Sequence, residues 1–299
     1  MADTYTVVPH SGAGCGSDCD STLHRPRDTG EALLCMREKL SALYAAGDNR
    51  AIFLRAYHVM TTQVNAAVHG GNDDFATPIF FDPGWVDRLA GRFARLYFQS
   101  LQEPVCDAWT KAHEQASQRR SSVVQNMLLG INAHINFDLA LGIHEVLQEE
   151  GDASDPELMA RRKFDHDQMN NVLMRCNPKI QEVLAREFGG GARLFSGLFG
   201  MLDELLTVAG LRYYRDRVWC NTLGLLSART PKEHEKVRLR LNWESLQTAE
   251  FLIKGTWMND AVFFLDKALR RPRWGRFEPD ADRGARAGGR VAHQLKLLY

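Results

Sequence analysis

The hydrophobic residues of the chain gather in helix-length segments that are separated by capping residues, prolines and glycines. Several segments begin with a polar residue followed by proline: Asp82-Pro83, Asp155-Pro156, Asn177-Pro178, Thr230-Pro231 and, more weakly, Glu103-Pro104. Proline suits the first helical turn because its missing N–H would have no partner there, and the preceding residue accepts from the free amides. This punctuation predicts helices at roughly 29–46, 49–69, 83–101, 104–118, 121–149, 156–176, 178–188, 192–209, 211–228, 231–254 and 256–270.

The same pattern argues against a β-sheet, because no series of short alternating segments bounded by Asn-Gly or Asp-Gly turns occurs. We therefore predict an all-α protein, a single large multi-helix bundle around a buried central helix at about 121–149. The helical domain is expected to span 28–270, between a mobile N-terminal arm at 1–27 and a basic C-terminal tail at 271–299.

Within the central segment, the stretch GINAHINFDL (130–139) alternates between apolar and polar residues as a strand would. Strong alternation lasts only about eight residues inside roughly thirty that carry no turn signal, so length favours a helix. A helix that is apolar nearly all round is buried. Its polar groups must then find partners on neighbouring helices, because an unpaired buried amide or carboxylate costs several kcal/mol.

The polar residues of this stretch fall on two faces. At about 100° per residue, His134 and Asp138 share one face, whereas Asn132 and Asn136 share another face nearly opposite. The asparagines are interpreted as a structural network held to adjacent backbones. The His–Asp pair has two readings: it can bind a metal ion or carry out proton transfer, and it can also simply fix helix packing.

A second segment, 51–70, places four polar side chains within about 40° of one another on a helical wheel: His58, Thr62, Asn65 and His69. A solvent-facing side of a helix is usually rich in Lys and Glu. This neutral, histidine-rich face is more typical of the lining of a polar cavity, although an ordinary exposed face would also fit.

A third segment, 155–176, places Asp165 in the middle of its apolar stripe. A lone carboxylate on a buried face needs a cation, a metal or a protonated partner. Arg161 and Arg162 are close enough in sequence to serve, which would make Asp165 merely structural.

Together these residues could converge on one polar pocket inside the helical core, the usual setting for shifted pKa values and catalysis. The expected catalytic residues are His134 as acid/base or ligand, Asp138 as its orienter or co-ligand, and His58 and Asp165. The expected substrate contacts are Asn136, Thr62, Asn65 and Tyr57. A divalent metal, if present, would bind His134 and Asp138 with His58, His69 or Asp165.

The sequence lacks the motifs of several common kinds of enzyme. It has no G-x-S-x-G elbow, phosphate loop or dinucleotide fingerprint, so no nucleotide cofactor is expected. The run NDDF (72–75) is similar to acidic clusters that bind magnesium–diphosphate in isoprenoid enzymes, but no second acidic motif accompanies it. The many aromatic residues are explained mainly by core packing, and any that face the pocket would favour a largely apolar substrate.

Composition and net charge argue against nucleic acid and membrane surfaces as binding partners. The chain has 299 residues, 44% of them hydrophobic, which is enough for one large core. Lys+Arg and Asp+Glu both number 37, so the net charge of zero provides no field for nucleic acid or an anionic membrane. The arginine-rich tail is read as solvated rather than as a nucleic-acid site. A small-molecule substrate is the expected partner.

The sequence also predicts a cytoplasmic protein. No apolar run approaches the ~20 residues of a membrane helix, and the N-terminus lacks a basic start followed by an apolar stretch. Reduced cysteines are then the default. Cys15 and Cys19, with His10 and His24, match no strong zinc pattern, so they are read as free thiols in a mobile arm.

Three segments carry a resemblance to a known family: GINAHINFDL (130–139), YHVMT (57–61) and FDPGWVDRLAGRFARLY (81–97). They resemble an all-helical family known only as a domain of unknown function, whose members share an Ala-His-Ile-Asn-x-Asp-Leu core. Here that core corresponds to Ala133, His134, Ile135, Asn136, Asp138 and Leu139. The likeness spans roughly residues 45–230. It implies an all-α fold and draws attention to His134, Asn136 and Asp138, but it implies no activity.

The expected function is an enzyme that acts on a largely apolar small molecule by non-redox chemistry in a polar pocket. Acid–base or metal-assisted cyclisation, isomerisation, elimination or hydrolysis would fit these residues. The alternative is a non-catalytic helical ligand-binding or interaction protein in which the His, Asn and Asp groups only specify packing.

Overall fold

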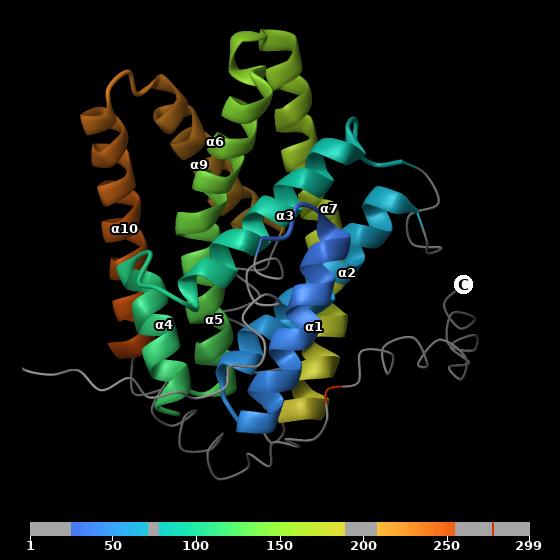
Figure 1. Cartoon of the computed structure of the whole chain (residues 1–299), viewed down its shortest axis with the longest axis vertical. Coiled ribbons are helices and arrows are strands. Elements are labelled where there is room, and N and C mark those ends of the chain that lie inside the picture. Colours follow the sequence, from blue (N-terminus) through green and yellow to red (C-terminus); the bar gives the residue numbers. More distant parts are fainter. Residues whose placement is uncertain (1–24, 71–77, 189–207, 255–276, 278–299) are drawn as a thin grey trace, which may run out of the picture.

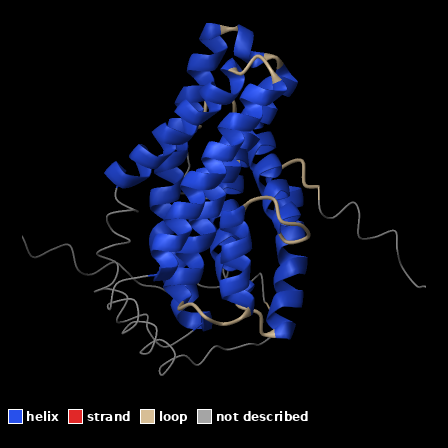
Figure 2. Cartoon of the chain, turned by 90° about the vertical axis from the view of Figure 1, so that its left-hand side faces the viewer, coloured by secondary structure: helices blue, strands red, loops and turns tan. Residues whose placement is uncertain are grey.

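The computed structural model describes residues 25–70, 78–188, 208–254 and Phe277. Every regular element in these ranges is a helix, which confirms the all-α class (Figures 1 and 2). The elements are α1 (Thr29–Ala46), α2 (Arg50–His69), α3 (Pro83–Ser100), α4 (Asp107–Ser117), α5 (Val123–Ala133), the π-turn η2 (His134–Asp138), α6 (Leu139–Glu150), the 3₁₀ turn η3 (Asp152–Ser154), α7 (Pro156–Phe188), α9 (Val208–Ser227) and α10 (Pro231–Lys254).

Local capping explains where the helices begin. Asp28 and Asp82 accept the backbone N–H groups of Glu31 and Trp85, three residues further on. Ser122 forms a capping box with Gln125, in which each side chain bonds the other residue's backbone. The predicted starts at Asp82-Pro83, Asp155-Pro156 and Thr230-Pro231 are confirmed.

Two predicted starts are wrong. Asn177-Pro178 does not begin a helix, because α7 continues through Pro178 to Phe188. An internal proline removes a backbone hydrogen bond and costs about 3 kcal/mol, but buried Cys176 and Val183 on either side keep both halves packed on the bundle. At 104–118 the helix begins later, at Asp107, where the Cys106 sulfur accepts the N–H of Trp109 at 3.5 Å.

The stretch 130–139 is helical, as its length predicts. α5, η2 and α6 form one continuous helix that ends at Gly151, whose φ of 74° is the left-handed conformation that glycine tolerates best. This long helix packs against α2, α3, α4, α9 and α10, and α3 crosses it obliquely (Figure 1). The π-turn at its middle was not predicted.

Two close backbone approaches tie the bundle together. Gly91 of α3 lies against the chain before α1, where an added Cβ would come within 2.2 Å of the Arg27 carbonyl carbon. Gly130 of α5 lies against the ring of Phe53 on α2, where an added Cβ would come within 2.3 Å of two ring carbons. Glycine at each position lets two elements pack more closely than a side chain allows.

Some predicted features lie outside the described residues: the Cys15/Cys19 segment, NDDF at 72–75, most of the helix at 192–209, the helix at 256–270 and the tail at 271–299 apart from Phe277. Phe277 is buried and its ring lies 5.8 Å from that of Tyr44 on α1. Among the described helices, none combines the length and the apolar character that crossing a lipid bilayer demands.

Candidate functional site

The central polar pair lies on the π-turn. His134 Nδ1 is 3.0 Å from Asp138 Oδ2, and Trp109 Nε1 on α4 donates to the same oxygen at 2.8 Å. A π-turn has more residues per turn than an α-helix, so residues four apart come closer to alignment. The π-turn thus holds the imidazole and the carboxyl group over one another, and both side chains are 1% exposed.

Five aromatic residues surround the imidazole of His134, and we call them the aromatic box: Phe53, Tyr57, Phe93, Tyr97 and Trp109. Phe93 stacks on the imidazole with ring centres 3.4 Å apart and planes 7° apart. Tyr57 presents an edge at 4.5 Å. Phe93 is partly buried, whereas the other four are buried, so the box comes nearest to solvent at Phe93.

The environment of the pair disfavours charge. Burial lowers the pKa of His134 well below its usual value. Burial likewise raises the pKa of Asp138 well above its usual value, against the opposing effect of the Trp109 hydrogen bond. The pair is therefore most stable in forms without net charge.

One nitrogen of this pair is unmatched. His134 Nε2 is buried and has no hydrogen-bond partner among the described residues. An unsatisfied buried polar group costs about 1–3 kcal/mol, and such groups are rare enough in native proteins to need an explanation.

The asparagine face forms a separate network toward α10. Asn132 Nδ2 donates to the Ser245 carbonyl oxygen at 2.9 Å, and Asn136 Nδ2 donates to Asn132 Oδ1 at 2.8 Å. This agrees with the structural interpretation of the two asparagines. Asn136, expected to contact substrate, lies in this network.

His58 lies in a second cluster, which joins α1, α2 and α7. Its Nδ1 is 3.4 Å from Arg55 Nη1, and its ring meets the edge of Phe277 at 5.5 Å. Arg55 forms an ion pair with Glu187 at 2.9 Å, and the Tyr44 hydroxyl donates to the same carboxylate. Adjacent residues on a helix point about 100° apart, which is why Tyr57 reaches His134 and His58 does not share its cluster.

Asn65 and His69, also on the α2 face, join a third cluster around Asp87 of α3. The Thr29 hydroxyl lies 2.6 Å from Asp87 Oδ1 and 2.8 Å from Asn65 Oδ1, and His69 Nε2 lies 3.2 Å from Asp87 Oδ2. Thr62 is exposed and donates to the carbonyl oxygen of its own helix at His58. These contacts tie α1 and α2 to α3.

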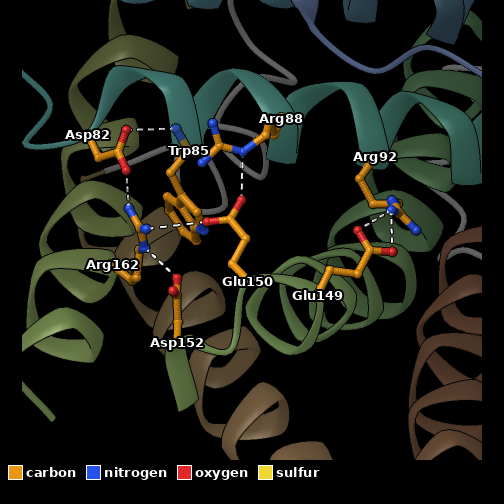
Figure 3. A network of polar contacts seen from close by, with 8 residues as sticks. All are labelled: Asp82, Trp85, Arg88, Arg92, Glu149, Glu150, Asp152 and Arg162. Carbon is orange, nitrogen blue, oxygen red and sulfur yellow. Dashed lines mark hydrogen bonds and ion pairs between the residues drawn. The ribbon is translucent and has the colours of Figure 1, made fainter. Parts of the chain in front are cut away.

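Asp165 lies in a fourth cluster, at the beginning of α3. Its carboxylate accepts the backbone N–H groups of Phe81 at 2.5 Å and Asp82 at 2.9 Å. Burial raises the pKa of Asp165, and the two amide bonds oppose that shift. The ion pairs of Arg162 go to other carboxylates, those of Asp82, Glu150 and Asp152 (Figure 3).

The predicted site residues thus fall into five groups rather than one, around His134, the two asparagines, His58, Asp87 and Asp165, and Thr62 bonds only within its own helix. His134, Asp138 and Tyr57 come together, while His58, the Asn65–His69 pair and Asp165 each contact other partners. In the part of the chain that the structure describes, no group of three or more His, Cys, Asp or Glu side chains is placed to hold a metal ion.

Two residues that position the pair were missing from the predicted site. Trp109 fixes the Asp138 carboxyl group, and Phe93 covers the His134 ring. From the sequence, the aromatic residues are assigned mainly to core packing, and neither of these two is singled out. No local spacing relates them to the His–Asp pair, because they lie on α4 and α3 and reach it through helix packing.

The comparisons with known proteins place the chain in a family. Residues 30–255 match the model of DUF5995, a family of unknown function. The chain belongs to the DUF5995 family. No curated protein and no solved structure matches it. The predicted resemblance to a helical family of unknown function is thereby confirmed. The matched region contains every described helix except the first residue of α1.

Proposed function

We propose that this DUF5995 protein is an acid–base enzyme that acts on a small, largely apolar molecule at His134. The observation that carries the proposal is His134 Nε2, which is buried and has no partner in the described part of the chain, while Asp138 holds the other ring nitrogen. An imidazole oriented by a carboxyl group through one nitrogen uses the other for proton transfer.

The surroundings support this role. Trp109 holds Asp138 in place, and the π-turn aligns the pair, a deviation that often occurs at functional sites. Because its pKa is depressed by burial, His134 is neutral near pH 7 and can accept a proton. The aromatic box surrounds the imidazole with largely apolar ring surface, which suits a largely apolar substrate.

Access would come through Phe93. It covers one face of the imidazole and is the member of the aromatic box that is only partly buried. Rotation of this side chain away from His134 would open the box without moving a helix. Isomerisation, elimination, cyclisation and hydrolysis all remain compatible with a single proton-transferring imidazole.

The proposal is tested by profiling small-molecule extracts incubated with the purified wild-type protein and with His134→Gln. We expect at least one metabolite to be consumed by the wild type and about 10²–10⁴-fold more slowly by the variant, the usual contribution of general acid–base catalysis. His69→Gln is the matched control, since His69 is half-exposed and pairs with Asp87 elsewhere. A metabolite turned over equally by all three proteins would contradict the proposal.

A second variant tests access directly. Phe93→Ala should expose His134 Nε2, so diethyl pyrocarbonate should modify this imidazole faster than in the wild type, as followed by peptide mass spectrometry. Unchanged protection of His134 in a folded Phe93→Ala protein would show that Phe93 does not control access.

The second candidate is a non-catalytic helical protein in which these groups specify packing. It is favoured by the partners that His58, Asp165 and Asn136 already have within the bundle. On this proposal His134→Gln lowers the melting temperature and no extract shows turnover by the wild type. If His134→Gln loses turnover but keeps the melting temperature of the wild type, the result supports the enzyme proposal.

A further inference from the structure

A pair of histidines lies outside all of these groups. His144 on α6 and His234 in the first turn of α10 face each other with ring centres 4.9 Å apart and planes inclined at 50°. His144 is buried and His234 is partly buried, so the pair connects the bundle interior with its surface. Neither residue is used by the proposed acid–base site.

One nitrogen of this pair has no hydrogen-bond partner. Among the described residues, His144 Nε2 is fully buried and nothing bonds it. Burial lowers the pKa of His144, and the neighbouring His234 lowers it further. A neutral imidazole with an unused nitrogen lone pair is the form that binds metal ions.

The spacing fits a shared metal ion. With metal–nitrogen bonds of about 2.0–2.1 Å, an ion lies about 3.2 Å from the centre of each ring, so two rings at a near-tetrahedral angle have centres roughly 5 Å apart. The observed 4.9 Å matches this value.

We propose that His144 and His234 bind one divalent transition-metal ion of the zinc, nickel and copper class, with water completing its coordination. Imidazole suits all three metals, and two protein ligands leave open positions for water. Pro231, Lys232 and Glu233, which precede His234 in the first turn of α10, are exposed. Because His144 lies on α6 and His234 lies in the first turn of α10, the ion would link the beginning of α10 to α6.

The test is calorimetric titration of the full-length chain with Zn²⁺ and Ni²⁺, in a Cys15→Ser, Cys19→Ser background so that these thiols do not compete. We expect one equivalent to bind and the melting temperature to rise with metal concentration, because an ion that binds only the folded state stabilises it. His234→Gln should abolish both effects. His234 is partly exposed, so this variant should fold, which far-ultraviolet circular dichroism checks.

The matched control is His69→Gln in the same background, which removes a more exposed histidine and leaves the pair intact. It should bind one equivalent as before. The proposal is overturned if the parent protein binds neither metal, or if His234→Gln and the parent bind with the same stoichiometry and affinity. Both outcomes are independent of turnover at His134, so failure here and failure of the enzyme proposal are distinguishable.

Discussion

Two polar clusters, one around buried Arg162 and one around buried His134, differ in charge and in how completely their polar atoms are paired. Arg162 on α7 bonds Asp152 at 2.7 Å, Asp82 at 2.5 Å and Glu150 at 3.3 Å, so each of its three guanidinium nitrogens has a carboxylate partner (Figure 3). Arg88 adds a second cation on Glu150 at 2.6 Å. The cluster is charged and fully paired.

The His134 cluster is uncharged and incompletely paired. Its buried, aromatic surroundings disfavour ionisation of either partner, and among the described residues Nε2 of the imidazole has no hydrogen-bond partner. The charged groups at the junction of α3, α6 and α7 each have a partner, whereas a buried nitrogen without a partner lowers stability. A buried polar atom that lowers stability is the better candidate for function.

The largest effect is expected from removing the cation of the charged cluster. Arg162→Ala would leave the buried carboxylate of Asp152 without its ion pair, and breaking a buried pair from one side costs about 3–5 kcal/mol. We expect the lower end of this range, because Asp82 and Glu150 are partly exposed. Urea unfolding measures the change in the free energy of unfolding.

Arg161→Ala is the matched control for Arg162→Ala. Arg161 is the adjacent residue on α7, and its pair with Glu157 is exposed on both sides, so its loss should change the free energy of unfolding by less than about 1 kcal/mol. Equal effects of the two variants would show that the charged cluster does not stabilise the junction.

The next largest effect is expected beside the aromatic box. Gly130→Ala would place a Cβ 2.3 Å from the Phe53 ring, and overpacking of this kind costs about 1–3 kcal/mol. Gly142→Ala, on α6 of the same long helix, would meet its nearest neighbour at 3.6 Å and should be neutral or stabilising by up to about 1 kcal/mol. If thermal unfolding ranks the two variants in the opposite order, Phe53 is not held against Gly130.

A pH dependence is expected at His113, whose ring stacks on Trp109 of the aromatic box. Burial, with a smaller effect of Arg50, lowers the pKa of His113 to about 4. In the unfolded chain His113 takes up a proton near pH 6.5, whereas in the folded protein it does so only near pH 4. The free energy of unfolding is therefore unaffected by His113 above pH 6.5 and falls as the pH drops from 6.5 toward 4. After discounting for partial exposure, the loss is about 1–2 kcal/mol.

His113→Gln tests this expectation. Its free energy of unfolding should fall less steeply than that of the wild type between pH 6.5 and 4, and the two curves should run parallel above pH 7. Parallel curves over the whole range would mean that His113 titrates normally in the folded protein.

The smallest effect on stability is expected from Asp138→Asn, because an amide oxygen can still accept from Trp109 Nε1. We expect a loss of about 1 kcal/mol in the free energy of unfolding. Turnover, if His134 acts as proposed, should fall far more than stability, since the amide no longer exchanges a proton with the imidazole. A stability loss as large as that of Arg162→Ala would place the pair with the structural clusters.

Much of the fold could be predicted from sequence because its signals are local. The Ser122–Gln125 box and the Asp82–Trp85 cap each join residues three positions apart, so they can be read directly from the chain. The contact between His134 and Asp138 is of the same kind, since four positions bring two side chains onto one helical face. Pro178 is the exception: packing of both flanks on the bundle overrode its local preference.

The sequence by itself therefore determined the described helices, most of their ends and the alignment of imidazole with carboxyl group. Tertiary structure alone decided that Trp109 and Phe93 complete the cluster and that His58 and Asp165 belong to other clusters. It also decided that Nε2 of His134 finds no partner among the described residues. The physical reason is the distance along the chain between the residues that make contact. A side chain meets neighbours within four residues through the geometry of its own helix, but it meets those on other helices only through the way the whole core packs.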